Sequence, residues 1–229
     1  TEIDPVAAMF NDAWFSQALH MTLAAFVATA FAVAGVHAFL LIKNRKNEFH
    51  KTALKIALSF GAVAAILQPL SGDISAKDVA KRQPAKLAAL EAHYKTSTHA
   101  GFVFGGIPNN KTEQVDYAIH VPGLLSYLAH GDFNAEVIGL DKFPKEERPP
   151  VVITHVAFQI MILSGCLLAL AGLLFIIFST RWKNILGKKW WLVFIAWLTP
   201  IGFIAVEAGW TVTETGRQLW ISYGVMKPK

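Results

Sequence analysis

Cysteine and charged residues are both scarce in this sequence. A single cysteine, Cys166, occurs among 229 residues, and charged residues make up 16% of the chain while apolar residues make up 54%. One thiol excludes an intramolecular disulfide framework and a metal site built from several thiolates. Cys166 lies within an apolar run, where a cysteine usually acts as a small apolar residue. This composition favours an integral membrane protein over a soluble one.

The N-terminal residues also lack the positive charge of a signal peptide. Residues 1–12 contain three acids and no Lys or Arg, so we expect no cleavable signal. The net charge of +5 does not indicate a nucleic-acid partner, because the Lys and Arg residues gather in two short connections beside apolar runs.

Four apolar runs are long enough to cross a membrane, at about residues 15–42, 53–71, 151–179 and 190–209. Residues 72–150, between the second and third runs, are polar and punctuated by Gly and Pro. Structureless loops beyond roughly 15 residues are uncommon and usually functional or disordered, so we interpret this loop as the substrate-facing part. The sequence therefore predicts an all-α fold: an integral membrane four-helix unit, one membrane domain over residues 1–229, with a long loop between helices 2 and 3.

The orientation follows from the two short connections. The first holds five basic residues against one acid, Glu48, and the third holds four basic residues and no acid. The positive-inside rule places both in the cytoplasm, which puts the two termini and the long loop on the outer side. The basic residues are Lys43, Arg45, Lys46, Lys51 and Lys55 in the first connection, and Arg181, Lys183, Lys188 and Lys189 in the third.

Histidines in the spans are candidate ligands or packing groups. His20 lies within two turns of the outer end of the first span, and His37 lies near its inner end. We interpret His37 as a hydrogen-bonding partner of a neighbouring helix. The third span enters from the same side with His155 and Met161, so Met161 shares a leaflet with His20. Axial His/Met ligands would give a low-spin haem, but a methionine in an apolar span is more often a packing residue.

Two further groups of ionisable residues lie outside the apolar runs. In the long loop, Pro84 precedes a short amphipathic helix in which Lys86 and Glu91 flank the apolar face. A solvated surface helix with ordinary charges is the alternative interpretation. After the fourth span, Glu214 is followed three residues later by Arg217. That cluster is either functional or a plain interfacial cap with Trp residues at the membrane boundary.

Several ordered motifs resemble one family. Residues 207–220 read E-A-G-W-x-x-x-E-x-G-R-Q-x-W, which closely resembles the signature of subunit I of cytochrome bd-type quinol oxidases. Residues 83–91, Q-P-A-K-L-A-A-L-E, are similar to the quinol-binding loop of its short-loop, cyanide-insensitive branch. The shorter motifs GGIP at 105–108, RPP at 148–150 and FQIM at 158–161 also have counterparts in the family.

The resemblance implies roles for individual residues. His20 and Met161 match the axial ligands of the family's low-spin haem b, and Lys86 and Glu91 match loop residues implicated in quinol oxidation. In the last motif, Glu214 matches the carboxylate that ligates the family's high-spin haem b. Trp210 and Arg217 match residues in the surroundings of that haem.

The resemblance covers only the second half of the family's subunit I, as though the subunit were split. The family's first half carries the haem d ligand, so a haem d or second high-spin site would be shared with a partner chain. Gln159 stands where the family commonly has an arginine, and Leu219 replaces its usual proline.

The resemblance therefore implies a quinol oxidase subunit in a bacterial or archaeal cytoplasmic membrane. Its expected partners are membrane lipid, the quinone pool, other multi-span subunits that supply the missing half, and a chain resembling subunit II. Electrons would pass from quinol through haem b to an oxygen-reducing site. The alternative is a quinone-coupled cytochrome b subunit of another redox complex that reduces no oxygen, and a weaker one is a haem-free structural subunit.

Overall fold

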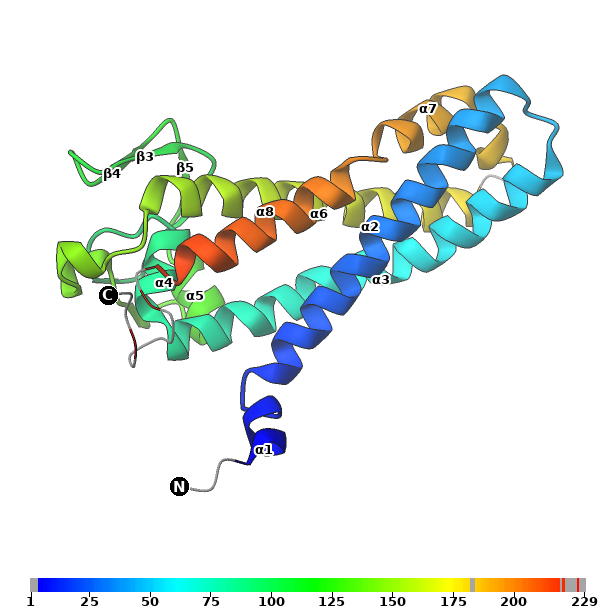
Figure 1. Cartoon of the computed structure of the whole chain (residues 1–229). Coiled ribbons are helices and arrows are strands. Elements are labelled where there is room, and N and C mark those ends of the chain that lie inside the picture. Colours follow the sequence, from blue (N-terminus) through cyan, green and yellow to red (C-terminus); the bar gives the residue numbers. More distant parts are fainter. Residues whose placement is uncertain (1–3, 182–183, 219, 221–225, 227–229) are drawn as a thin grey trace. The chain divides into compact units, whose positions relative to one another are not determined.

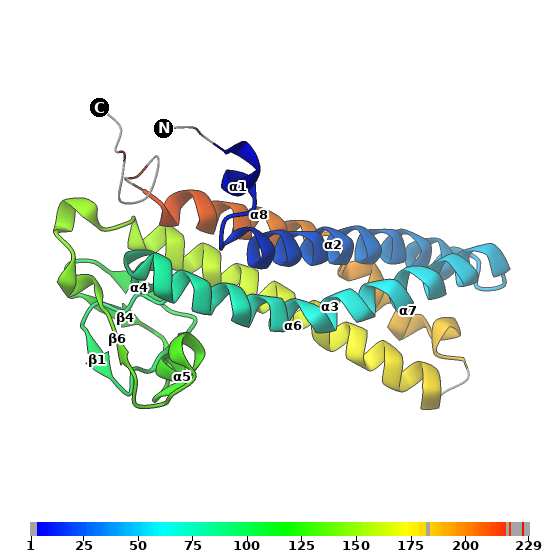
Figure 2. The same ribbon diagram turned by 90° about the horizontal axis from the view of Figure 1, so that it is seen from below.

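The chain forms two compact units in a computed structural model, shown in Figures 1 and 2, that describes residues 4–181, 184–218, 220 and 226. The first unit comprises residues 1–72 and 162–206, and the second comprises residues 73–161 and 207–229. Lys183 and Leu219, both used above, lie outside the described residues. The expectation of one membrane domain stays a prediction, and each unit is described by itself.

The prediction of a mostly helical protein with four membrane spans is confirmed. By length and composition, four segments among the described residues can cross a membrane. They are α2 (Trp14–Lys43), α3 (Glu48–Arg82), α6 (Val151–Arg181), and α7 (Lys189–Trp197) together with α8 (Ile201–Gly216). A short helix, α1 (Pro5–Met9), precedes α2, and its first turn is capped by the carboxylate of Asp4, which accepts from two backbone N–H groups.

The second span is longer than its apolar run. The sequence predicted that the span ends at Ser71, but α3 continues to Arg82. The polar extension keeps the helix because acids and bases lie one turn apart, with an ion pair of 2.6 Å between Asp73 and Lys77. Lys81 and Arg82 in the last turn also interact favourably with the helix dipole. The apolar run therefore did not give the end of this helix, and the non-helical connection begins only at Gln83.

The fourth span is broken, whereas the sequence predicted one continuous helix over residues 190–209. Pro200 lies between α7 and α8, and it has no N–H to donate to the carbonyl of Ala196. Thr199 bonds to that carbonyl instead, through its backbone N–H at 3.3 Å and its hydroxyl at 2.6 Å. The chain makes a tight turn at residues 198–200 and resumes as α8.

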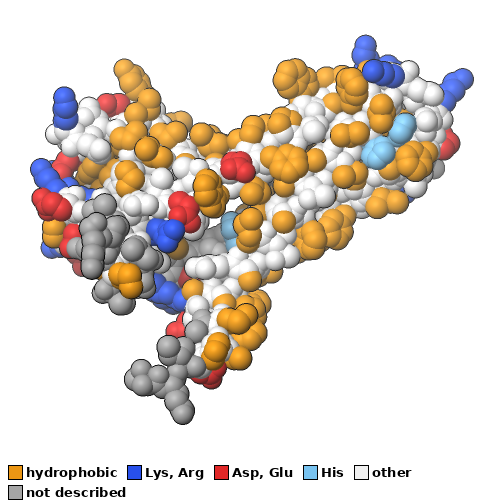
Figure 3. Space-filling model, viewed as in Figure 1, with side chains coloured by type: hydrophobic (Ala, Val, Ile, Leu, Met, Phe, Trp, Pro, Cys, Tyr) orange, Lys and Arg blue, Asp and Glu red, His pale blue; other side chains and the backbone are white. Residues whose placement is uncertain are grey.

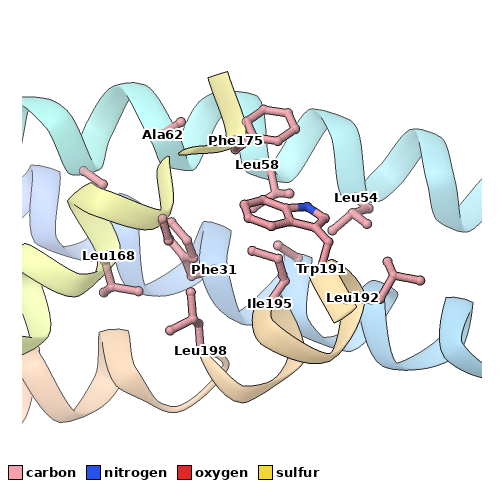
Figure 4. Packing of buried hydrophobic residues seen from close by; sticks show 14 of the residues in the cluster. Phe31, Leu54, Leu58, Ala62, Leu168, Phe175, Trp191, Leu192, Ile195 and Leu198 are labelled. Carbon is pink, nitrogen blue, oxygen red and sulfur yellow. The ribbon is translucent and has the colours of Figure 1, made fainter. Parts of the chain in front are cut away.

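The first unit has one apolar core between α2, α3, α6 and α7 (Figure 4). Phe31, Leu58, Trp191 and Ile195 are fully buried in it. Helices approach closely where small residues meet, as membrane helices generally do. A Cβ on Gly172 of α6 would lie 2.8 Å from the Cα of Ala62 on α3, so glycine is needed there.

Basic residues and two histidines mark one end of this unit. Figure 3 shows Lys and Arg side chains gathered where α2 meets α3, and hydrophobic side chains over the outward surfaces of the spans. Nδ1 of His37 on α2 lies 2.9 Å from Nδ1 of His50 on α3. The prediction that His37 hydrogen-bonds a neighbouring helix is confirmed.

The second unit contains the long loop, which adds short strands to the predicted all-α fold. Three antiparallel pairs form, with Thr98 opposite Glu136, Val103 opposite His120, and Pro108 opposite Val115. Gly105 and Gly106 both have positive φ, at 66° and 81°, and the chain bends at Gly105. The loop elements are α4 (Pro84–Leu90), β1 (Ser97–Thr98), β2 (Phe102–Phe104), β3 (Ile107–Asn109), β4 (Gln114–Asp116), β5 (Ile119–Val121), α5 (Leu124–His130), β6 (Glu136–Val137), η1 (Leu140–Lys142) and η2 (Lys145–Glu147).

Candidate functional site

The helix α4, which carries Lys86 and precedes Glu91, is buried. It begins at Pro84, as predicted, because the fixed φ of proline and its missing N–H suit the first helical position. Ala85 and the four residues 87–90 are buried. Ala88 and Ala89 belong to one apolar cluster with Leu140 and Val151, and Leu90 belongs to another with Ala157 and Val212. The alternative interpretation, a solvated surface helix, is therefore wrong.

Glu91 caps this helix inside the protein. Its backbone N–H donates to the carbonyl of Leu87 at 3.0 Å, and its side chain is only 4% exposed. The Oε2 atom is buried without a hydrogen-bond partner among the described residues. Burial raises the pKa of this carboxyl from 4.5 to about 8. Glu91 is thus a carboxylic acid that can exchange a proton close to neutral pH.

Lys86 lies beside the end of α8, a neighbourhood that the sequence did not predict. A Cβ on Gly216 would be 3.0 Å from both Cγ and Cε of Lys86, so the lysine stem packs on the glycine backbone. Glu214 forms an ion pair with Arg217 there, with 3.0 Å between Oε2 and Nε. Burial lowers the pKa of Lys86, Glu214 opposes that shift, and Arg217 adds to it. The structure therefore brings Lys86, Glu214 and Arg217 into one charged group.

The beginning of α6 packs against α8. The hydroxyl of Thr154 donates to that of Thr215 at 3.0 Å, next to Glu214. Further along, a Cβ on Gly209 would lie 3.1 Å from Sδ of Met161, so the glycine leaves room for the thioether. Trp210, the next residue, is 63% exposed, and nothing in the structure assigns it a contact with Glu214.

Two polar residues of α6, His155 and Gln159, contact the loop directly, which the sequence did not predict. His155 is fully buried, with Nδ1 2.7 Å from the carbonyl oxygen of Leu90 and Nε2 3.2 Å from that of Gly105. Gln159 accepts from the N–H of Gly105 at 3.0 Å and donates to the carbonyl of Val103 at 2.8 Å. Their i, i+4 spacing on an otherwise apolar span is the signal from which the sequence could have predicted a shared polar face.

His20 has a defined tautomer in the first unit. The hydroxyl of Ser71 donates to the carbonyl of Gln68 at 2.8 Å, so it must accept from the Nδ1–H of His20, 2.9 Å away. The lone pair of His20 then lies on Nε2, where the side-chain N–H of Gln68 donates to it at 3.2 Å. An imidazole fixed through Nδ1–H is a typical histidine ligand.

The imidazole of His20, the thioether of Met161 and the carboxylate of Glu214 are side chains whose donor atoms suit haem iron. His20 has an Nε2 lone pair, Met161 has its thioether beside Gly209, and Arg217 bonds only to Oε2 of Glu214 among the described residues. Iron binding at His20 requires the Gln68 amide to turn aside, and Oε1 of Gln68 is already buried without a partner among the described residues. Because His20 and Met161 belong to different units, their sharing of one haem stays a prediction.

Comparisons with known proteins agree on one family. The family profile described as "Cytochrome bd terminal oxidase subunit I" matches residues 1–229. A Bacillus subtilis (strain 168) protein, named provisionally as a cytochrome bd menaquinol oxidase subunit I, is 38% identical over 99% of this chain and 52% of its own length. The same organism's "Cytochrome bd ubiquinol oxidase subunit 1" is 34% identical over 90% of this chain and 46% of its own length.

A solved structure gives the same result. "The structure of bd oxidase from Geobacillus thermodenitrificans" contains a chain that superimposes with a TM-score of 0.90 at 36% identity, covering 99% of this chain and 52% of that one. The chain thus spans about half the length of the relatives that it matches. This multi-pass membrane chain belongs to the cytochrome bd terminal oxidase subunit I family.

Proposed function

We propose that this chain provides the quinol-oxidising and haem b-ligating part of a cytochrome bd-type oxidase. One observation carries the proposal: Glu91 is a buried carboxyl with an unpaired oxygen and a pKa of about 8, at the end of a loop helix. The names of the two relatives supply the substrate class, since one is a menaquinol oxidase subunit and the other a ubiquinol oxidase subunit.

Glu91 is the proposed proton acceptor. A quinol must lose two protons when it gives up two electrons, and a general base works best when its pKa lies near the operating pH. Below pH 8 most Glu91 side chains hold their proton already, so the fraction able to accept one grows as the pH rises towards about 8. Turnover with quinol therefore increases with pH over this range.

Lys86 is the proposed orienting group for the quinol head. Its ammonium donates hydrogen bonds only, and its stem is held by Gly216 and its charge balanced by Glu214. The head group is proposed to lie between a donor, Lys86, and an acceptor, Glu91, which are five residues apart on one short helix and its cap.

His20 and Met161 are the proposed ligands of a low-spin haem b, and Glu214 is the proposed ligand of a high-spin haem. When bound, the haems accept the electrons of quinol one at a time and carry them onward. The bond to Ser71 through Nδ1–H leaves the lone pair of His20 on Nε2, which iron would take in place of the Gln68 amide, and Gly209 leaves room for Met161. We propose that Arg217 holds one oxygen of Glu214 and leaves the other for iron.

The rest of the oxygen-reducing site is proposed to come from the spans that make up the other half of the family's subunit I, whichever polypeptide carries them. The loop after α3 is proposed to face outward, because basic residues gather at the opposite connections. Purification from native membranes should therefore yield a complex that contains both haem b and haem d, measured by pyridine haemochromogen spectra. A pure preparation with quinol oxidase activity and only haem b would contradict this assignment.

Substitution of Glu91 by Gln tests the central proposal. Gln has the shape of the protonated acid but accepts no proton at neutral pH, so quinol-dependent reduction of haem b should slow by roughly 10²- to 10⁴-fold. Haem content and reduction by dithionite should stay unchanged. Glu136→Gln is the matched control, because Glu136 is an exposed carboxylate of the same loop. Equal quinol-dependent rates in Glu91→Gln and wild type would refute the role of Glu91.

A further inference from the structure

His155 and Gln159 of α6 hydrogen-bond at two places to the loop between α3 and α6, residues 83–150, which we call the quinol loop. His155 contacts the carbonyls of Leu90 and Gly105, and Gln159 contacts Val103 and Gly105. Both side chains are buried, and they lie one helical turn apart. We refer to the two residues as the α6 clasp.

The contact between His155 and Leu90 bears directly on Glu91. The carbonyl of Leu90 and the N–H of Glu91 belong to one planar peptide group. His155 holds its oxygen at 2.7 Å, and the carbonyl of Leu87 accepts from its N–H at 3.0 Å. The peptide plane that precedes Glu91 is therefore fixed at both ends, which limits the directions in which the carboxyl can point.

The two ring nitrogens of His155 differ in their contacts. Carbonyl oxygens only accept hydrogen bonds, and a neutral imidazole has a single N–H. The shorter distance, 2.7 Å to Leu90, identifies Nδ1 as the donor, whereas Nε2 is 3.2 Å from Gly105. Gly105 has a second attachment, since its N–H donates to Gln159. The bond to Leu90 has no such substitute, so it is the contact on which the position of Glu91 depends.

We infer that His155, supported by Gln159, is a positioning residue for quinol oxidation that aims Glu91 at the quinol head group and keeps α4 sealed against water. The inference rests on the proposed role of Glu91. It assigns His155 no contact with quinol or haem. Loss of the clasp should loosen α4, let water reach Glu91 and misplace its carboxyl.

The surroundings of Glu91 allow this effect to be seen in a pH profile. The ionisable side chains on the elements around α4 include Arg82, Lys86, His93, Asp141, His155 and Glu214. Burial is nevertheless the cause of the raised pKa of Glu91. A change that admits water must therefore lower that pKa towards the ordinary value of a carboxyl.

Three substitutions at His155 separate the contacts. His155→Phe keeps a ring of similar volume but removes both ring nitrogens, and with them the N–H that donates to Leu90. Asn carries its amide nitrogen near the position of Nδ1 and reaches Leu90, whereas Gln carries it near Nε2 and reaches Gly105. Ser126→Ala is the control, because Ser126 is a fully buried loop residue that bonds to the backbone of Ala100 and Ala135, away from α4.

The purified complex is assayed with menadiol and a short-chain ubiquinol from pH 6 to 9, and kcat and KM are separated. For His155→Phe we expect kcat/KM to fall roughly tenfold to a hundredfold. The pH of half-maximal rate should drop by about one unit or more, with haem content unchanged. His155→Asn should restore both kcat/KM and the pH of half-maximal rate, whereas His155→Gln should restore neither. Ser126→Ala should match wild type.

An unshifted pH profile in His155→Phe, or equal rescue by Asn and Gln, overturns the inference. If His155→Phe does not accumulate, the comparison of Asn with Gln carries the same test. The proposed function fails separately: if Glu91→Gln keeps the pH-dependent rise of wild type, Glu91 is not the acceptor. If Glu91→Gln abolishes the rise while His155→Phe leaves it in place, only the clasp is wrong.

Discussion

The buried carboxyl of Glu91 should make the stability of this protein fall as the pH rises. In the unfolded chain the carboxyl loses its proton near pH 4.5, whereas in the folded protein burial holds it until about pH 8. Between these values the folded state binds more protons than the unfolded state, so the free energy of unfolding decreases with increasing pH. The stabilising contribution is complete below pH 4.5 and is lost by the time the pH exceeds about 8.

The magnitude follows from the two pKa values. Each unit of pKa difference corresponds to about 1.4 kcal/mol, so the full shift amounts to roughly 5 kcal/mol. Integration from pH 6 to pH 9, with the folded pKa at about 8, gives a loss of roughly 2 to 3 kcal/mol. For a chain of this length, that loss lowers the unfolding midpoint by roughly 4 to 12 °C.

Thermal unfolding in detergent, followed by the fluorescence of the seven tryptophans, measures this loss in wild type, Glu91→Gln and Glu136→Gln at the same scan rate. Gln at position 91 does not titrate, so its midpoint should fall less between pH 6 and 9 than that of wild type, by the amount given above. Glu136→Gln should follow wild type, because Glu136 is exposed. If all three proteins lose the same stability over this pH range, the carboxyl of Glu91 is not buried in its acid form.

Three further predictions concern the ligands and the charged group. Met161→Ala should convert the reduced-minus-oxidised alpha band of the low-spin haem b to a five-coordinate or altered form, and an unchanged band would count against Met161 as a ligand. Ser71→Ala removes the acceptor of the His20 Nδ1–H, so haem b content or midpoint potential should change by less than in His20→Ala; identical potential and content would show that Ser71 does not orient His20. Gly216→Ala places a methyl group 3.0 Å from the stem of Lys86, so KM for quinol should rise several-fold, whereas an unaffected KM would separate Lys86 from the quinol site.

The spans were predictable from the sequence because a membrane imposes a length and a composition on each helix. The apolar runs gave α2 and α6 to within two residues at each end. The apolar run did not predict where α3 ends, because helix propensity and ion pairs such as that between Asp73 and Lys77 continue the helix beyond the apolar residues. The apolar runs also missed the break at Pro200, because hydropathy does not register the loss of a backbone donor.

The candidate site was only partly predictable, since a sequence does not show which side chains become buried. Lys86 and Glu91 stood out as charges on a short helix, yet solvated charges have the same pattern. Leu90, the residue before Glu91, packs beside Ala157 of α6, a helix that begins 60 residues further along the chain than Glu91. The proximity of Lys86 to Glu214 likewise depends on packing between α4 and α8, which no local pattern encodes.

The first three turns of α6 connect the groups proposed to act in this unit. Thr154 bonds beside Glu214 on α8, His155 bonds beside Glu91 on the quinol loop, and Met161 follows on the same helix. A helix fixes such side chains relative to one another more accurately than a loop does. The loop carries Glu91 but lacks long strands of its own to hold it, so α6 supplies the rigidity. Proton transfer at Glu91 and ligation at Met161 are therefore expected to depend on the same helix, even though the two residues are 70 positions apart.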